Sequence, residues 1–168
     1  MTDATLSHDF RIREAIPADI DDLIRLVHDL AVYERQPAAA TATPDHFRDA
    51  LFPTDGQPTA YAHVAERQER VVGMAIWFVS FSTWTGRHGI WLEDLFVEPR
   101  QRGLGIGTAF LVRLAQVSRD RGWTRLEWCV LDWNTPSIDF YRSQGAVAQD
   151  QWTTFRVDGA ALARLAGS

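Results

Sequence analysis

The stretch from Ile90 to Val117 constrains the fold of this chain more than any other. It opens with a largely apolar run, continues through the basic turn Arg100-Gln-Arg102, has glycine at three of the next five positions, and ends in an amphipathic pattern. The first turn of a helix leaves backbone N–H groups without intrahelical acceptors, and the helix dipole draws anions toward them. Glycines remove the side chains that would keep a ligand away from that backbone. The stretch therefore predicts a strand, a phosphate-binding turn and a helix.

The glycine pattern argues against two common phosphate-binding turns. Residues 103–107 read G-x-G-x-G, whereas dinucleotide-binding folds carry G-x-G-x-x-G and an acidic residue about 20 positions later. Trp123 and Thr124 stand at that later position. A P-loop needs a Gly-Lys pair, and the chain contains no lysine. The glycines could also serve only as a helix cap, but the two arginines directly before them favour a phosphate.

Composition narrows the class of protein and its partners. The 168 residues are 46% apolar and 23% charged with a net charge of −5, which is typical of one soluble globular domain and argues against nucleic acid as a partner. No apolar run approaches the about 18 residues of a membrane span, and the N-terminus does not resemble a signal peptide. With Cys129 as the single cysteine, we expect a cytoplasmic location and a buried thiol. The histidines show no paired spacing, so we expect no metal site.

Periodicity and turn residues predict one mixed α/β domain. We expect strands at 10–14, 59–66, 70–80, 90–97, 125–131, near Val147 and at 152–157. We expect helices from Pro17 to about Glu34, from Thr43 to before Pro53, from the glycine turn to Gly122, from Asn134 to Gly145, and at 158–166. The loop 82–87 holds Trp84.

Beyond the glycine turn itself, a longer pattern points to a family. Gln101-Arg-Gly-Leu-Gly-Ile-Gly107, after the apolar strand end Leu95-Phe-Val97, resembles the coenzyme A pyrophosphate turn (Q/R-x-x-G-x-G/A) of the GNAT family of N-acetyltransferases. Asn134 after the next strand and Phe140-Tyr141 in the following helix look like the second half of the signature. The resemblance spans essentially the whole chain. It implies a mixed, mostly antiparallel sheet flanked by helices and splayed at the strand carrying Glu93, in a single domain of residues 1–168 with its core at about 10–158.

Shorter segments resemble two branches of that family. Leu30-Ala-Val-Tyr-Glu34, Trp91-Leu-Glu-Asp94 and Asp132-Trp-Asn134 look like spermidine/spermine N1-acetyltransferases. Ser82-Thr-Trp84 and Val130-Leu-Asp-Trp-Asn134 lie closer to thialysine Nε-acetyltransferases. Ser82 stands where the polyamine pattern has an acid. The resemblance thus implies an acetyl-CoA-dependent homodimer that acetylates a primary amine of a small polyamine, a diamine or a lysine-like molecule.

Acetyl transfer to an amine needs a proton acceptor and a proton donor. An alkylammonium of pKa near 10 attacks a thioester only after it has lost its proton, and Glu93 is the candidate base, directly or through a water. Glu93 could instead be a rim carboxylate that only attracts the ammonium. The resemblance makes Tyr141 the acid that protonates the departing coenzyme A thiolate, because a phenol keeps its proton at neutral pH. Tyr141 could otherwise be a half-buried helix aromatic.

The resemblance also assigns residues to the cofactor. Backbone groups of Leu95, Phe96 and Val97 are expected to pair with the pantetheine arm, and Asn134 to hold that arm from its other side with Pro136 and Ser137 nearby. Arg102 could instead be a solvated charge, and Asn134 only a helix cap. The pyrophosphate is expected over the turn Arg102, Gly103, Leu104, Gly105, Ile106, Gly107 and Thr108.

The amine site carried over from the polyamine branch consists of Tyr33, Glu34, Trp84, Glu93 and Asp94. Carboxylates attract a cation, and aromatic faces bind alkylammonium groups. Because adjacent strand residues point to opposite faces, we expect Glu93 and Asp94 to face different ways. Glu34 could equally be a solvated helix charge. Two other functions stay open: a non-catalytic acyl-CoA-binding regulator, and a peptide or protein N-acetyltransferase.

Overall fold

The computed structural model describes residues 9–167. The chain divides into two compact units, Met1–Cys129 and Val130–Ser168. Within the described residues, the first unit holds the sheet and three helices, and the second holds two short helices. The expectation of a single domain over 1–168 stays a prediction.

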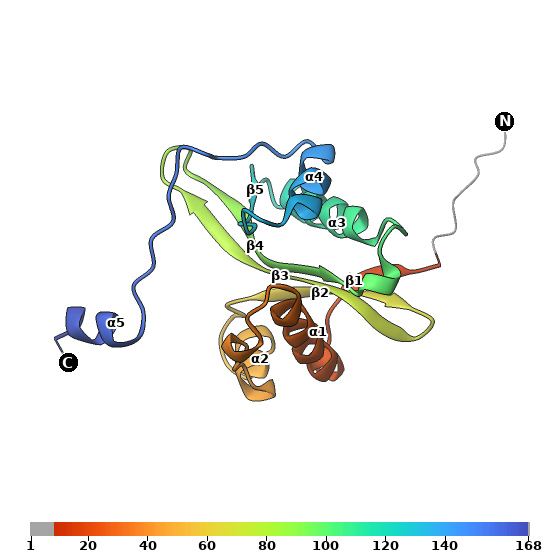
Figure 1. Cartoon of the computed structure of the whole chain (residues 1–168), viewed down its shortest axis with the longest axis horizontal. Coiled ribbons are helices and arrows are strands. Elements are labelled where there is room, and N and C mark those ends of the chain that lie inside the picture. Colours follow the sequence, from red (N-terminus) through yellow and green to blue (C-terminus); the bar gives the residue numbers. More distant parts are fainter. Residues whose placement is uncertain (1–8, 168) are drawn as a thin grey trace. The chain divides into compact units, whose positions relative to one another are not determined.

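The sheet of the first unit has five strands whose spatial order follows the sequence, β1-β2-β3-β4-β5 (Figure 1). The strands are β1 (Arg11–Glu14), β2 (Tyr61–Arg67), β3 (Arg70–Ser82), β4 (Arg87–Val97) and β5 (Leu126–Glu127). The first four pair antiparallel, and β5 lies parallel to β4. A parallel pair needs a crossover connection, which the helix α3 (Ile106–Asp120) supplies. The mixed, mostly antiparallel sheet is confirmed.

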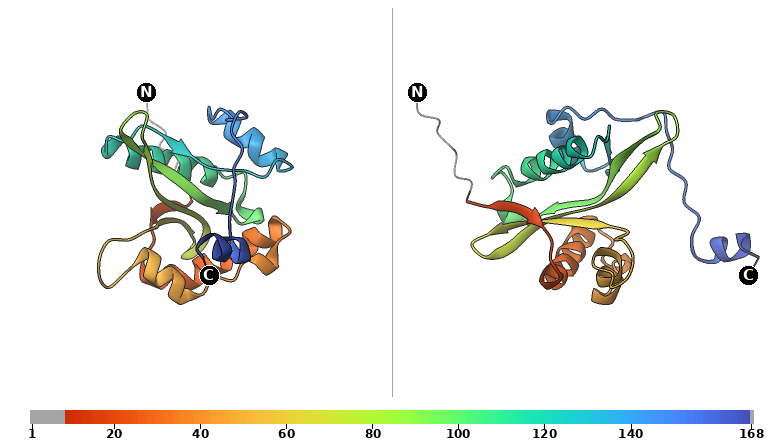
Figure 2. Two further views of the ribbon diagram at one scale, coloured as in Figure 1. Left: turned by 90° about the vertical axis from the view of Figure 1, so that its left-hand side faces the viewer. Right: turned by 180° about the vertical axis from the view of Figure 1, so that it is seen from behind.

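Helices cover both faces of this sheet. Figures 1 and 2 show α1 (Ile20–Tyr33) and α2 (Pro44–Leu51) on one face and α3 on the other. Apolar residues of α1 recur at three- and four-residue spacing, so Leu23 and Leu26 are fully buried against Met74 of β3. Phe110 and Leu114 of α3 are buried on the opposite side. Three 3₁₀ turns lie at Pro17–Asp19, Pro37–Ala39 and Pro99–Gln101.

The second unit contains α4 (Thr135–Ser143) and α5 (Gly159–Leu165). Both helices were expected from the sequence. The strands expected near Val147 and at 152–157 are absent, and the expected strand 125–131 shrinks to β5. Alternating apolar residues favour an extended chain, but a strand also needs a neighbouring backbone to complete its hydrogen bonds. No strand of the described residues pairs with 147–157.

The exposure of Cys129 and the lengths of the helices bear on two predictions made from the sequence. Cys129 is exposed, so the prediction of a buried thiol is wrong. Its position just beyond β5, where the ladder has already ended, accounts for the exposure. Within residues 9–167, every helix is too short or too polar to cross a membrane.

Candidate functional site

Glu93 lies at a β-bulge in β4. Leu92 pairs with Trp77 and Asp94 pairs with the preceding residue of β3, Ile76, so Glu93 is the extra residue between two adjacent pairs. A bulge bends its strand and re-aims a side chain, and bulges are common beside functional sites. The simple alternation that would send Glu93 and Asp94 to opposite faces is interrupted here. The sequence carries no signal for the bulge beyond two acids in an apolar strand.

Two other carboxylates, Glu93 and Glu34, act on the carboxyl of Asp94 at this bulge. The Asp94 carboxyl is half-buried, and burial, followed by the charges of Glu93 and Glu34, raises its pKa to about 6. Burial also raises the pKa of Glu34. Glu93 is exposed, and its Oε2 accepts a hydrogen bond of 3.0 Å from the indole Nε1 of Trp91. The structure therefore brings together three of the five residues expected to bind an amine, and their combined charge suits a cation.

Trp84 lies away from these carboxylates. It stands in the β3–β4 hairpin loop and is 87% exposed. Strands rise about 3.3 Å per residue, so Glu93 lies about 20 Å along β4 from Arg87, where this loop ends. Within the first unit, Trp84 is not brought to the carboxylates.

Tyr33 and Arg102 meet, although the sequence assigned them to different ligands. The Arg102 guanidinium lies 4.9 Å from the ring centroid of Tyr33 and 5.6 Å from that of Phe96. Its Nε donates a 3.0 Å hydrogen bond to the carbonyl of Val97. Arg102 is therefore an ordered side chain at the end of β4. Nothing in the sequence indicated this contact between α1 and the turn.

The glycine turn leaves open space above its backbone. Gly103 and Gly105 have φ values of 80° and 84°, in the left-handed region that favours glycine, and a Cβ at either position would meet nothing within 4 Å. Gly105 is the N-cap of α3, and the amide of Ala109 donates the first helical hydrogen bond to its carbonyl, at 2.9 Å. The amides of residues 106–108 precede that bond, so this end of α3 can accept an anion.

The free edge of β4 runs beside this turn. Pairing between β4 and β5 is limited to Ile90 with Leu126 and Trp91 with Glu127. From Leu92 to Val97, no strand of the described residues lies on the side of β4 opposite β3. The sheet is thus splayed from the bulge onward, as expected. Backbone groups of Leu95, Phe96 and Val97 lie on this segment.

The remaining expected residues lie on α4 of the second unit. The Asn134 side chain caps α4, and its Oδ1 accepts from the Ser137 amide at 3.4 Å, with Pro136 in the first turn. Tyr141 is half-buried, and its ring lies 5.3 Å from that of Phe140. Seven residues make about two helical turns, so Asn134 and Tyr141 lie on one side of α4.

Among residues 9–167, no group of three or more His, Cys, Asp or Glu side chains is placed to hold an ion. An acyl-coenzyme A fits the residues present, because the open turn can take a phosphate and the unpaired edge of β4 can take an extended amide chain.

Known proteins resemble this chain both in sequence and in fold. Residues 24–146 match the Acetyltransferase (GNAT) family. Thialysine N-epsilon-acetyltransferase of Bos taurus is 35% identical, over 93% of this chain and 96% of its own length. Spermidine/spermine N(1)-acetyltransferase-like protein 1 of Homo sapiens is 31% identical, over 94% of this chain and 24% of that longer protein. An integron cassette protein from the mobile metagenome of V. cholerae superposes with a TM-score of 0.79 at 23% identity, covering 95% of this chain and 99% of that one, which shows the fold.

Proposed function

Because the chain belongs to the GNAT family and is an acetyltransferase that uses acetyl-CoA and an amine, we propose that the amine is a small lysine-like molecule or polyamine. The proposal rests mainly on Asp94 at the bulge, where burial and then the charges of Glu93 and Glu34 raise the pKa of its carboxyl. A compact cation offsets the repulsion among three carboxylates. The two relatives named above carry thialysine and spermidine/spermine in their names, and both are small amines.

Glu93 is proposed as the base. It is exposed, so an ammonium or a water can reach it, and the Trp91 indole N–H holds Oε2. The second oxygen of Glu93 then accepts the proton of the amine, directly or through a water. Half-buried Asp94 holds the ammonium before this transfer, because a nearby cation favours its ionised form.

The first unit offers the cofactor a backbone cradle. Residues 103–108 provide amides and open space for a pyrophosphate, and Arg102 adds positive charge beside them. Leu95, Phe96 and Val97 offer the unpaired edge of β4 to the amides of a pantetheine arm. When bound, acetyl-CoA supplies the acetyl group as an activated thioester.

Tyr141 is proposed as the acid. Its phenol keeps the proton at neutral pH and donates it to the sulfur that departs from the acetyl carbon. Asn134, on the same side of α4, is proposed to hold the pantetheine arm, with Pro136 and Ser137 beside it.

The assay that tests this function is the release of thiol from acetyl-CoA with aminoethylcysteine, lysine, spermidine and putrescine as acceptors. We expect turnover with at least one of them and little with N-terminal peptides. Tyr141→Phe should lower kcat about 100-fold with little change in the KM for acetyl-CoA, because general acid catalysis contributes about 10²–10⁴-fold. Phe140→Leu is the matched control.

Two outcomes contradict the proposal. Tight acetyl-CoA binding without turnover on any amine would indicate a regulator that only binds acyl-CoA. Preference for peptides would indicate a protein N-acetyltransferase. An unchanged kcat in Tyr141→Phe would remove the acid role alone.

We further propose a homodimer in the cytoplasm. The single cysteine excludes an intrachain disulfide and is compatible with a reducing compartment. The dimer is supported by the segment 147–157, where Val147, Phe155 and Val157 are 79%, 90% and 51% exposed.

A further inference from the structure

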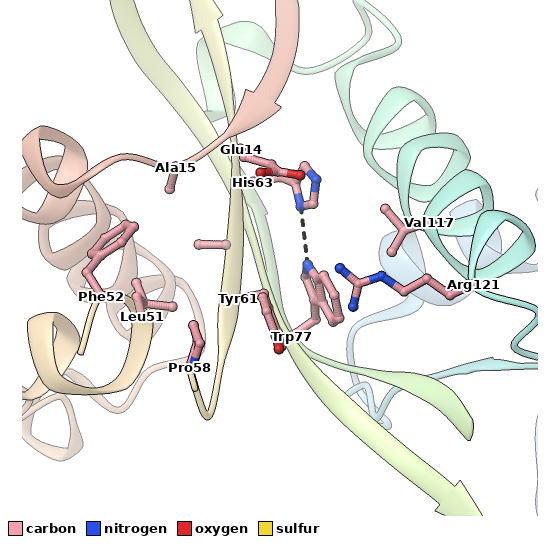
Figure 3. Close-up of a pocket in the computed structure, with 11 residues that line it drawn as sticks. Glu14, Ala15, Leu51, Phe52, Pro58, Tyr61, His63, Trp77, Val117 and Arg121 are labelled. Carbon is pink, nitrogen blue, oxygen red and sulfur yellow. Dashed lines mark hydrogen bonds between the residues drawn. The ribbon is translucent and has the colours of Figure 1, made fainter. Parts of the chain in front are cut away.

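A pocket lies in the first unit, where β1 ends and β2 continues as the edge of the sheet (Figure 3). Its volume is about 260 Å³. None of the residues around it belongs to the proposed acetyl-transfer site. The lining falls into a polar and aromatic group, with Glu14, Tyr61, His63, Trp77 and Arg121, and an apolar group that includes Leu51, Phe52 and Pro58.

His63 brings an unmet hydrogen-bond donor to this pocket. Its side chain is only 2% exposed, and its Nδ1 accepts a 3.2 Å hydrogen bond from the Trp77 indole (Figure 3). In a neutral imidazole the other nitrogen then carries the proton. That nitrogen, Nε2, is buried and has no hydrogen-bond partner among the described residues. A buried donor without an acceptor is costly, so the position favours a ligand that can accept.

Burial and the charges around His63 keep it neutral, and one neighbouring cation, Arg121, has no ion-pair partner among residues 9–167. Burial, then Arg113 and Arg121, lower the pKa of His63 to about 4 against the opposing charge of Glu14. The Glu14 carboxylate lies 3.7 Å from the Arg113 guanidinium, so these two charges offset each other. Arg121 forms no ion pair with any residue in 9–167, and no hydrogen bond of its side chain is found there.

Arg121 is nevertheless held in place by aromatic rings. Its guanidinium lies 4.9 Å from the ring of Trp123, 5.7 Å from that of Tyr61 and 5.8 Å from that of Trp77. Figure 3 shows Arg121 extending from α3 toward Trp77, on the side of β2 that His63 also faces. A guanidinium fixed on aromatic faces keeps its N–H edges available for a planar anion.

We propose that this pocket binds a small carboxylate with an apolar body, whose oxygens accept from His63 Nε2 and pair with Arg121. Tyr61 and Val117, which lie on the same side of β2 as His63 in Figure 3, contact the apolar body. The volume lies just below the about 300–1,000 Å³ of pockets for drug-sized ligands, which limits the ligand to a small aromatic or branched aliphatic acid. The anion supplies the ion-pair partner that Arg121 lacks among residues 9–167.

The test follows His63 by NMR in the full chain labelled at histidine, without acetyl-CoA. Because burial lowers the pKa of His63 to about 4, its ring signals should stay constant between pH 5 and pH 8 without the ligand. Benzoate at pH 7 should shift its ring signals in a saturable manner and raise its pKa, whereas benzyl alcohol, the uncharged analogue, should not. An absence of saturation with benzoate, or an equal response to inorganic phosphate, overturns the proposal.

Variants separate binding from folding. Arg121→Gln should weaken the binding of benzoate at least about tenfold, which is the loss expected for a charged hydrogen bond. It should leave acetyl transfer unchanged. Arg119→Gln, on the same helix and paired with Asp120 in the native chain, is the matched control. His63→Leu removes the unmet donor and should also abolish benzoate binding, measured by calorimetry. Equal affinity in Arg121→Gln and Arg119→Gln refutes the assigned role of Arg121.

Discussion

Among the side chains, Asp94 has a carboxyl whose charge its surroundings disfavour. Its pKa of about 6 in the folded chain exceeds the ordinary value of 3.8 because of burial and of the charges of Glu93 and Glu34. Between these two values the folded state binds the proton more tightly than the unfolded state. The contribution of Asp94 to stability is therefore favourable at acid pH and is lost as the pH rises through 6.

Asp94→Asn should accordingly stabilise the protein at pH 8 and change little at pH 4. The shift of about two units corresponds to at most about 3 kcal/mol, and solvent at the half-buried side chain reduces the expected gain to about 1–2 kcal/mol. Urea unfolding at both pH values measures it. Asp120→Asn, at an exposed carboxylate, is the control without such a gain. The same free energy change at pH 4 and pH 8 would contradict the prediction.

The contacts of individual side chains were the least predictable part of the site. The sequence singled out Glu34, Asp94, Tyr33 and Arg102. It could not indicate that Glu34 acts on Asp94 or that Arg102 lies against Tyr33. Each pair joins α1 to β4 or its turn, far apart in the chain. Such contacts depend on how the helix packs on the sheet, which local periodicity does not specify.

At the scale of elements, the strand, glycine turn and helix at 90–120 were predictable because each has a local cause. Alternating residues favour the strand, glycines that can adopt a positive φ favour the turn, and an apolar stripe at three- and four-residue spacing favours the helix. Each of these patterns involves only residues close together in the chain. The bulge at Glu93 was not predictable, since it is defined by the register between β4 and β3. The strands expected at 147–157 are absent for a similar reason. A strand depends on a neighbouring strand as well as on its own residues.

Gly105 offers a test of the turn as a phosphate cradle. Gly105→Ala places a methyl group in open space at φ 84°, so about 1–2 kcal/mol of stability is lost to the left-handed conformation. It should also raise the KM for acetyl-CoA several-fold, because the methyl group enters the space proposed for the pyrophosphate. Steady-state kinetics and thermal unfolding measure the two effects.

Gly122 provides the matched control for this substitution. It follows the other end of α3, has φ 67°, and a Cβ added there would also meet nothing within 4 Å. Gly122→Ala should therefore cost similar stability and leave the KM for acetyl-CoA unchanged. If both variants change the KM alike, the effect belongs to α3 as a whole and the cradle is refuted.

In the whole molecule, the exposed apolar side chains of the segment 147–157 bear on the number of subunits. Phe155 and Val157 alternate with polar residues, as in a strand with one apolar face, yet both are exposed. Exposed apolar side chains in that pattern are typical of a surface that a partner covers. A second copy of the chain is the partner proposed above.

Light scattering should therefore give a mass near twice the 19.0 kDa of the chain. Phe155→Ser with Val157→Ser should shift the mass toward one chain, because burial of these two side chains would stabilise the dimer by about 2–3 kcal/mol each. Val32→Ser removes a comparably exposed apolar side chain from α1 and should leave the mass unchanged. A single-chain mass for the unaltered protein would refute the dimer, and dissociation caused by Val32→Ser alone would move the interface to α1. Because the acetyl-transfer assay is run on the same samples, loss of the dimer with full activity would further show that each chain carries a complete site.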